Sequence, residues 1–117
     1  MSEEYRSTQR FRAYLPVRVH RAHTPHVIET LTKDIGMSGL RCISSMVCPV
    51  SSEVSLELVL GSHSEALELR GRTVWFQTIP HSEQFDLGIV FLDLSPQNKR
   101  RLSVYLERLS VQQAVPA

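Results

Sequence analysis

The alternation of apolar and polar side chains predicts that most of this chain forms short β-strands. The clearest example is residues 54–60, where Val54, Leu56, Leu58 and Leu60 occupy every second position. A period of two is typical of a strand with one buried face. Turn-forming residues such as Gly, Pro and Ser separate the runs at short intervals. Further strand-like runs cover residues 13–19, 27–32, 40–44, 65–78 and 85–91.

The pattern changes near the C-terminus, where it predicts a helix. Ser95-Pro96 combines a favourable N-cap with a proline at the first helical position. Behind it, one apolar stripe with helical spacing is made by Leu102, Tyr105, Leu106 and Leu109. Six strands followed by one helix predict a mainly β fold, a six-stranded antiparallel small barrel with a C-terminal helix.

A length of 117 residues indicates one domain. Residues 1–12 are polar and charged, which predicts a flexible N-terminal arm, and residues 13–110 would form the barrel with its terminal helix. Residues 111–117 are expected to be a tail. The long run 65–78 contains Gly71, which is interpreted as a bulge or bend, and Gly88 is expected to leave one face of the last strand open.

One stretch, Lys33 to Arg41, separates two strand-like runs with an acid and two glycines. It predicts a turn directly after Asp34. Gly36 and Gly39 can adopt positive φ or allow close approach to the backbone. A carboxylate beside exposed N–H groups can bind the donor edge of a flat ligand. Acid-plus-glycine turns are also common in hairpins that have no ligand, so ordinary turn chemistry is the alternative.

The charge distribution favours a compact anionic ligand over a long nucleic acid. Net charge is only +1, but residues 1–21 hold five arginines against two glutamates, whereas residues 29–93 are acidic. Nucleic-acid binding usually needs a broad basic face. There is no apolar run of membrane-spanning length and no signal-peptide core, so a cytoplasmic location without membrane contact is expected.

The sequence contains no recognisable set of catalytic or metal-binding residues. Cys42 and Cys48 are predicted to be reduced thiols. His20, His23 and His26 surround a proline loop without the Asp or Cys that would complete a metal site. No His–acid pair has a catalytic signature around it, so we expect neither an enzyme nor a cofactor.

Several motifs in order resemble the PilZ domain family, bacterial receptors for cyclic di-GMP. The family has an Arg-x-x-x-Arg arm, here Arg6 to Arg10, and an Asp/Asn-x-Ser-x-x-Gly turn, here Asp34 to Gly39. The runs 71–75 and 87–91 and the terminal helix are also similar, so the resemblance covers residues 5–110. One position departs from it, because Gly36 stands where the family usually has serine.

The resemblance implies a cyclic di-GMP site, in which arginine forks bind phosphate and guanine and a carboxylate binds the guanine N–H edge. The residues it implicates are Arg6, Arg10, Asp34, Gly36, Ser38, Gly39 and Trp75. Simpler interpretations remain: the two arm arginines are solvated charges, and Trp75 belongs to the core.

Three functions follow from these observations. The first is a receptor or adaptor in second-messenger signalling, which orders its N-terminal arm over the dinucleotide and acts on a downstream protein. The second is a degenerate PilZ-like protein-interaction module that does not bind nucleotide. The third, a barrel that binds RNA or single-stranded DNA, is disfavoured by the acidic middle and the few aromatic residues.

Overall fold

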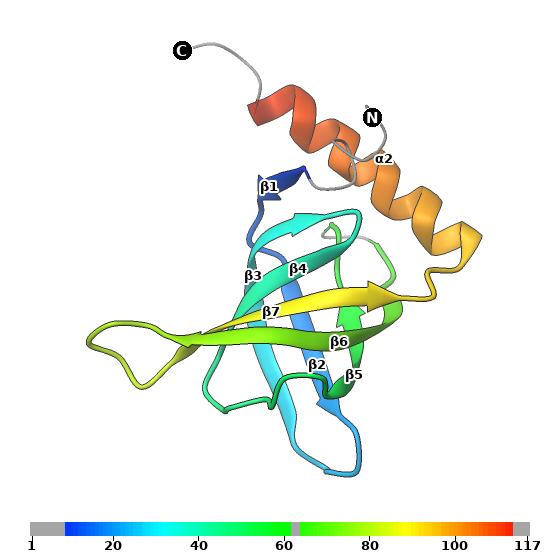
Figure 1. Cartoon of the computed structure of the whole chain (residues 1–117). Coiled ribbons are helices and arrows are strands. Elements are labelled where there is room, and N and C mark those ends of the chain that lie inside the picture. Colours follow the sequence, from blue (N-terminus) through cyan, green and yellow to red (C-terminus); the bar gives the residue numbers. More distant parts are fainter. Residues whose placement is uncertain (1–8, 62–63, 114–117) are drawn as a thin grey trace.

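The computed structural model describes residues 9–61 and 64–113, which form seven strands and one helix (Figure 1). The strands are β1 (Arg10–Arg12), β2 (Pro16–Arg21), β3 (Val27–Gly36), β4 (Gly39–Ser44), β5 (Glu53–Leu58), β6 (Leu67–Thr78) and β7 (Phe85–Leu92), and the helix is α2 (Pro96–Gln113).

Strands β2 to β7 form a closed antiparallel barrel, as the sequence pattern predicts. The strand order is β1-β3-β2-β5-β6-β7-β4, and a further pairing between β3 and β4 closes the ring. β1 is an additional outer strand. It pairs with the end of β3, beyond the point where β2 begins opposite Leu31, so β3 contacts β2 and β1 in succession along one edge.

The core fills the barrel and extends to α2, which lies across one end of it (Figure 1). Alternate residues of the strands point inward, among them Val17, Val19, Leu56 and Leu58, each at most 2% exposed. The helix begins where predicted, with the Ser95 hydroxyl accepting a hydrogen bond from the Asn98 N–H at 3.1 Å. Its buried stripe consists of Leu102, Leu106 and Leu109.

The structure corrects several predicted boundaries. Arg10–Arg12, assigned to a flexible arm, form β1 because β3 offers them a free edge. At the other end, α2 continues to Gln113 and so includes the first residues of the predicted tail. Asp34 lies within β3, which runs to Gly36, so the turn begins later than predicted.

The interpretation of Gly71 as a bulge is wrong. The irregularity in β6 lies between Thr73 and Trp75. At Gly71, a Cβ would lie 2.6 Å from the Ile89 methyl Cγ2, so the glycine avoids a clash with this core side chain. Among the described residues, no helix has the length and apolar character that crossing a bilayer requires.

Candidate functional site

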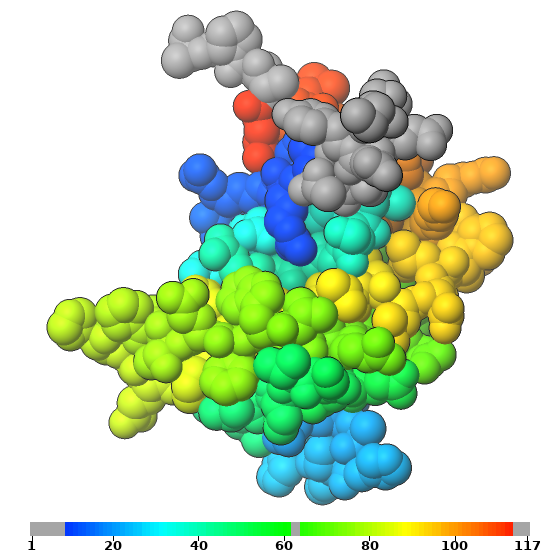
Figure 2. All heavy atoms as spheres, in the orientation of Figure 1, coloured from blue at the N-terminus to red at the C-terminus, as the bar shows by residue number. Residues whose placement is uncertain are grey.

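A single lateral row of residues crosses five strands on the outer face of the barrel. In the strand register, Arg12 of β1 faces Asp34 of β3, Asp34 faces Arg41 of β4, Arg41 faces Gly88 of β7, and Gly88 faces Trp75 of β6. Four strand spacings of about 4.8 Å make this row about 19 Å wide. Figure 2 shows β1 in dark blue above the cyan of β3 and β4, with the yellow and green of β7 and β6 below.

Asp34 stands between two arginines at the centre of the row. Its Oδ1 lies 3.0 Å from Arg10 Nη1, and its Oδ2 lies 2.8 Å from Arg41 Nη2. A bulge in β3 between Thr32 and Asp34 shifts the register just before this position. Thr32 and Ile35 are both buried although three residues apart, and the extra residue between them accounts for Asp34 facing outward.

The arm passes so close to β3 at Gly36 that a side chain there would collide with it. An ideal Cβ on Gly36 would lie 2.6 Å from the Gln9 carbonyl oxygen and 3.5 Å from Arg10 Cγ. No glycine among the described residues has a positive φ, so Gly36 supplies space and not an unusual backbone conformation. The place that a serine side chain would take is therefore occupied by the backbone of the arm.

The other two residues of the predicted turn motif lie at its end. A Cβ on Gly39 would overlap the Ile89 carbonyl oxygen, so this glycine allows β4 and β7 to approach each other. Ser38 is exposed in the β3–β4 turn, and its carbonyl accepts a hydrogen bond from the Phe91 N–H at 2.8 Å. The chain itself thus fills the space beside both glycines of the motif.

Trp75 closes the row by lying over Gly88. A Cβ on Gly88 would overlap indole atoms Cε2 and Nε1, so the expectation of an open face at Gly88 is wrong. Trp75 is nevertheless 39% exposed, which places it on the surface and not in the core. An indole that contacts a neighbouring strand and remains partly exposed offers a surface on which an aromatic base can stack.

The described part of the arm is also attached to α2. The side-chain amide of Gln113 accepts a hydrogen bond from the Arg12 N–H at 3.2 Å and donates one to the Arg12 carbonyl at 2.6 Å. The Gln113 amide thus makes the same two kinds of backbone hydrogen bond to the free edge of β1 that a neighbouring strand would make. A groove of about 520 Å³ lies alongside, between the arm, Met37 of the β3–β4 turn and α2.

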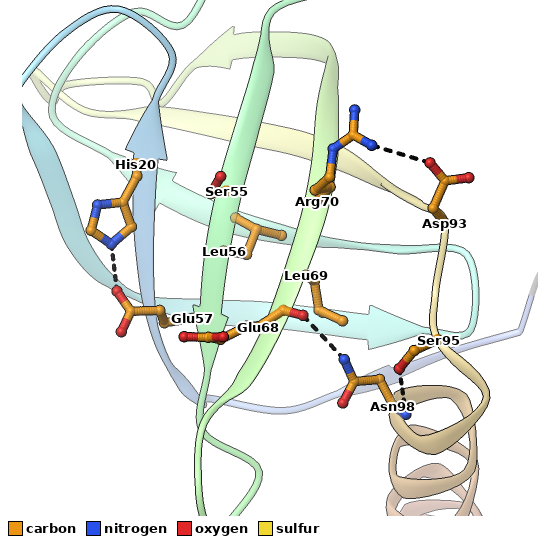
Figure 3. A pocket seen from close by; sticks show the side chains of 10 residues that line it. All are labelled: His20, Ser55, Leu56, Glu57, Glu68, Leu69, Arg70, Asp93, Ser95 and Asn98. Carbon is orange, nitrogen blue, oxygen red and sulfur yellow. Dashed lines mark hydrogen bonds and ion pairs between the residues drawn. The ribbon is translucent and has the colours of Figure 1, made fainter.

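A second pocket, of about 460 Å³, lies away from the row, between β2, β5, β6 and the start of α2 (Figure 3). Its charged groups largely satisfy one another. Arg70 binds Glu53 at 2.9 Å and Asp93 at 3.2 Å, while the His20 ring contacts Glu57. The hydrogen bond from His20 lowers the pKa of Glu57. This mutual pairing leaves few groups to bind an anion, so the pocket is not our candidate site.

The two cysteines do not contribute reactive groups. Both are free and buried. Burial raises the pKa of Cys42 to about 12 and also raises the pKa of Cys48. Each thiol is therefore protonated at neutral pH and inert as a nucleophile.

The structure brings together part of the predicted site. Arg10, Asp34 and Gly36 lie side by side, and Trp75 lies on the same face, whereas Arg6 is outside the described residues. Ser38 and Gly39 lie in and just after the turn. Sequence reasoning did not include Arg12, Arg41 or Gly88. Arg12 shares a face with Arg10 because the two residues are i and i+2 of a strand, but this follows only once β1 is known to be a strand.

The family model described as "PilZ domain" matches residues 4–108. The chain belongs to the PilZ domain family. No curated protein matches the chain.

Solved structures show the same fold at low sequence identity. The Bacillus subtilis inhibitor of motility MotI/DgrA is 17% identical with a TM-score of 0.78, over 91% of this PilZ domain and 51% of that chain. The PilZ domain of Escherichia coli YcgR, solved with c-di-GMP, is 13% identical with a TM-score of 0.69, and the match covers 90% of this chain and 91% of that chain. The PilZ domain of CeSA from a cellulose-synthesizing bacterium is 18% identical with a TM-score of 0.59, and the match covers 91% of this chain and 99% of that chain. The chain spans about half the length of the MotI chain.

Proposed function

We propose that this PilZ domain is a receptor for cyclic di-GMP, which acts as a small adaptor and not as an enzyme. The observation that carries the proposal is the meeting of the two motifs in space, with Arg10 Nη1 and Asp34 Oδ1 3.0 Å apart. These residues are 24 positions apart in the chain, and only the pairing of β1 with β3 brings them together. The YcgR and Borreliella burgdorferi PlzA structures, which share the fold, were solved with c-di-GMP.

The chemistry of the row suits this ligand. Cyclic di-GMP carries two phosphates and two guanines. Arg10 and Arg12 present their guanidinium groups on the same face, and a guanidinium fork binds phosphate oxygens or guanine O6 and N7 in a bidentate manner. Asp34 accepts hydrogen bonds from guanine N–H groups. Trp75 at the other end of the row offers a stacking surface for a base.

The arm is the part of the domain through which binding would be signalled. Arg10 joins it to Asp34, and the two hydrogen bonds from Gln113 join it to the C-terminal end of α2. A ligand that draws Arg10 away from Asp34 changes the position of β1, and through Gln113 this change reaches the helix. A downstream protein that contacts the arm or α2 would then distinguish the two arrangements.

Titration calorimetry with cyclic di-GMP on wild type and Arg10→Ala tests the proposal. Loss of a hydrogen bond to a charged group should weaken binding about 10- to 150-fold. Arg18→Ala is the matched control, since Arg18 is also a strand arginine in an exposed ion pair, 3.1 Å from Glu29, but lies on β2 outside the row. No binding by wild type at high micromolar ligand in low salt would contradict the proposal.

The contact at Gly36 favours a second candidate, a PilZ-like interaction module that does not bind nucleotide. With glycine at this position the arm packs directly on β3, where a serine would meet the Gln9 carbonyl. Such a domain would bind its partner protein regardless of nucleotide. Partner capture that is unchanged by cyclic di-GMP and by Arg10→Ala would favour this alternative over the receptor.

A further inference from the structure

Asp34 and Arg41 place a hydrogen-bond acceptor directly beside a donor on the outer face of the barrel. Arg41 Nη2 and Asp34 Oδ2 lie 2.8 Å apart, and the two side chains are 38% and 18% exposed. They are cross-strand partners on β3 and β4, so the backbone register keeps them adjacent in addition to the ion pair. A flat ligand whose edge carries a donor next to an acceptor would match this pair.

Both side chains have bonding capacity left. A carboxylate offers about four lone-pair sites, and Asp34 uses one on each oxygen for Arg10 and Arg41. Arg41 has several N–H groups, and its Nε is buried with no hydrogen-bond partner among residues 9–61 and 64–113. A buried donor without an acceptor is unfavourable. A rearrangement of the guanidinium on a ligand oxygen that also gives this N–H an acceptor would therefore favour binding.

Trp75 supplies a flat surface next to this pair. Its indole lies over Gly88, and Gly88 is the residue directly across from Arg41. Trp75 and Arg41 are thus the two cross-strand neighbours of Gly88. A base stacked on the exposed side of the indole would direct one edge toward β4 and β3, where Arg41 and Asp34 lie.

We propose that Asp34 and Arg41 form a guanine-reading pair, with the base stacked on Trp75. Guanine presents its N1–H donor beside its O6 acceptor, so Asp34 would accept from N1–H and Arg41 would donate to O6. Adenine presents the reverse order, an N1 acceptor beside an N6 amino donor, and opposes the pair. The proposal rests on the receptor function above and extends it, since it assigns base selectivity to an arginine outside both motifs.

The test compares the affinities of cyclic di-GMP and cyclic di-AMP, measured by calorimetry on wild type and variants. One bidentate base contact corresponds to a preference of about 5- to 150-fold, which wild type should show for the guanine ligand. Arg41→Ala and Arg41→Lys should both reduce this preference toward one. Lysine keeps the charge and its attraction for phosphate but lacks the planar fork, so the two variants separate base reading from charge.

Arg18→Ala is the matched control, because Arg18 is also a strand arginine in an exposed ion pair, with Glu29, but lies on β2 and not on a strand of the row. It should leave both affinities, and therefore their ratio, unchanged. If both Arg41 variants keep the wild-type ratio, or if wild type binds both dinucleotides equally, the guanine-reading pair is refuted while the receptor function stands. If wild type binds neither ligand, the receptor function itself fails, and this proposal falls with it.

Discussion

Restoring the family's serine at position 36 should destabilise this domain. In a strand, replacing glycine by a residue with a side chain is ordinarily favourable by about 0.5–1 kcal/mol, because glycine loses more backbone freedom on folding. Here the new Cβ would lie 2.6 Å from the Gln9 carbonyl oxygen, which belongs to the backbone and cannot rotate away. The expected sign is therefore the opposite of the intrinsic preference.

The magnitude follows from the competing terms. Overpacking of this kind costs about 1–3 kcal/mol. A serine hydroxyl that bonds the ligand would return only about 0.5–1.5 kcal/mol, and only when ligand is bound. The steric cost should prevail in the free protein, so Gly36→Ser and Gly36→Ala should both lower the free energy of unfolding, with β1 losing amide protection first.

Urea unfolding of wild type and the Gly36 variants measures this loss of stability. The urea midpoint of the variants should fall while the slope of the transition stays constant. A truncated chain that lacks residues 1–12 provides the control, because the Gln9 carbonyl is gone. In that background Gly36→Ser should be neutral or stabilising, and the difference between backgrounds is the coupling energy. A variant as stable as wild type in the full chain, or an equal loss in both backgrounds, would refute the role given to Gly36.

Three further predictions concern the surroundings of the site. Gly88→Ala should displace the Trp75 indole, destabilise the domain by about 1–3 kcal/mol and shift the tryptophan emission; unchanged emission would contradict the packing described. Gln113→Ala should remove two hydrogen bonds to Arg12, at about 0.5–1.5 kcal/mol each, and speed amide exchange at Arg12, whereas unaltered exchange would show that the helix does not hold β1. Because burial raises the pKa of Cys42 from 9.0 to about 12, folding favours the protonated thiol, so stability should fall as pH rises from 9 toward 12. The urea midpoint of Cys42→Ala should fall less over that range, and an equal fall in wild type and variant would contradict this assignment.

The fold could be predicted largely from local patterns. Alternation in runs such as 54–60 locates strands because each has one face in the barrel. Ser95 likewise identifies the start of α2 because the N-cap hydrogen bond is local. The strand at Arg10–Arg12 was missed because its only apolar residue is Phe11, and its stability comes from pairing with a distant segment.

The site was predicted less completely, because its geometry depends on strand register. The contact between Arg10 and Asp34 follows from two motifs that can be recognised in the sequence. The place of Arg41 between Asp34 and Gly88 follows from pairings across β3, β4 and β7, which no local pattern specifies. The bulge before Asp34 has no glycine to mark it, whereas the glycine that suggested a bulge in β6 faces the core.

In the proposed receptor, an arginine of the arm and Asp34 on β3 bind one dinucleotide together. The most direct measurement is a titration of cyclic di-GMP against wild type and Arg10→Ala, followed by the fluorescence of Trp75. We expect a saturable change in wild type and a binding curve for Arg10→Ala that is shifted about 10- to 150-fold toward higher ligand concentration. Saturation of both proteins at the same ligand concentration, or no change in either, would contradict it.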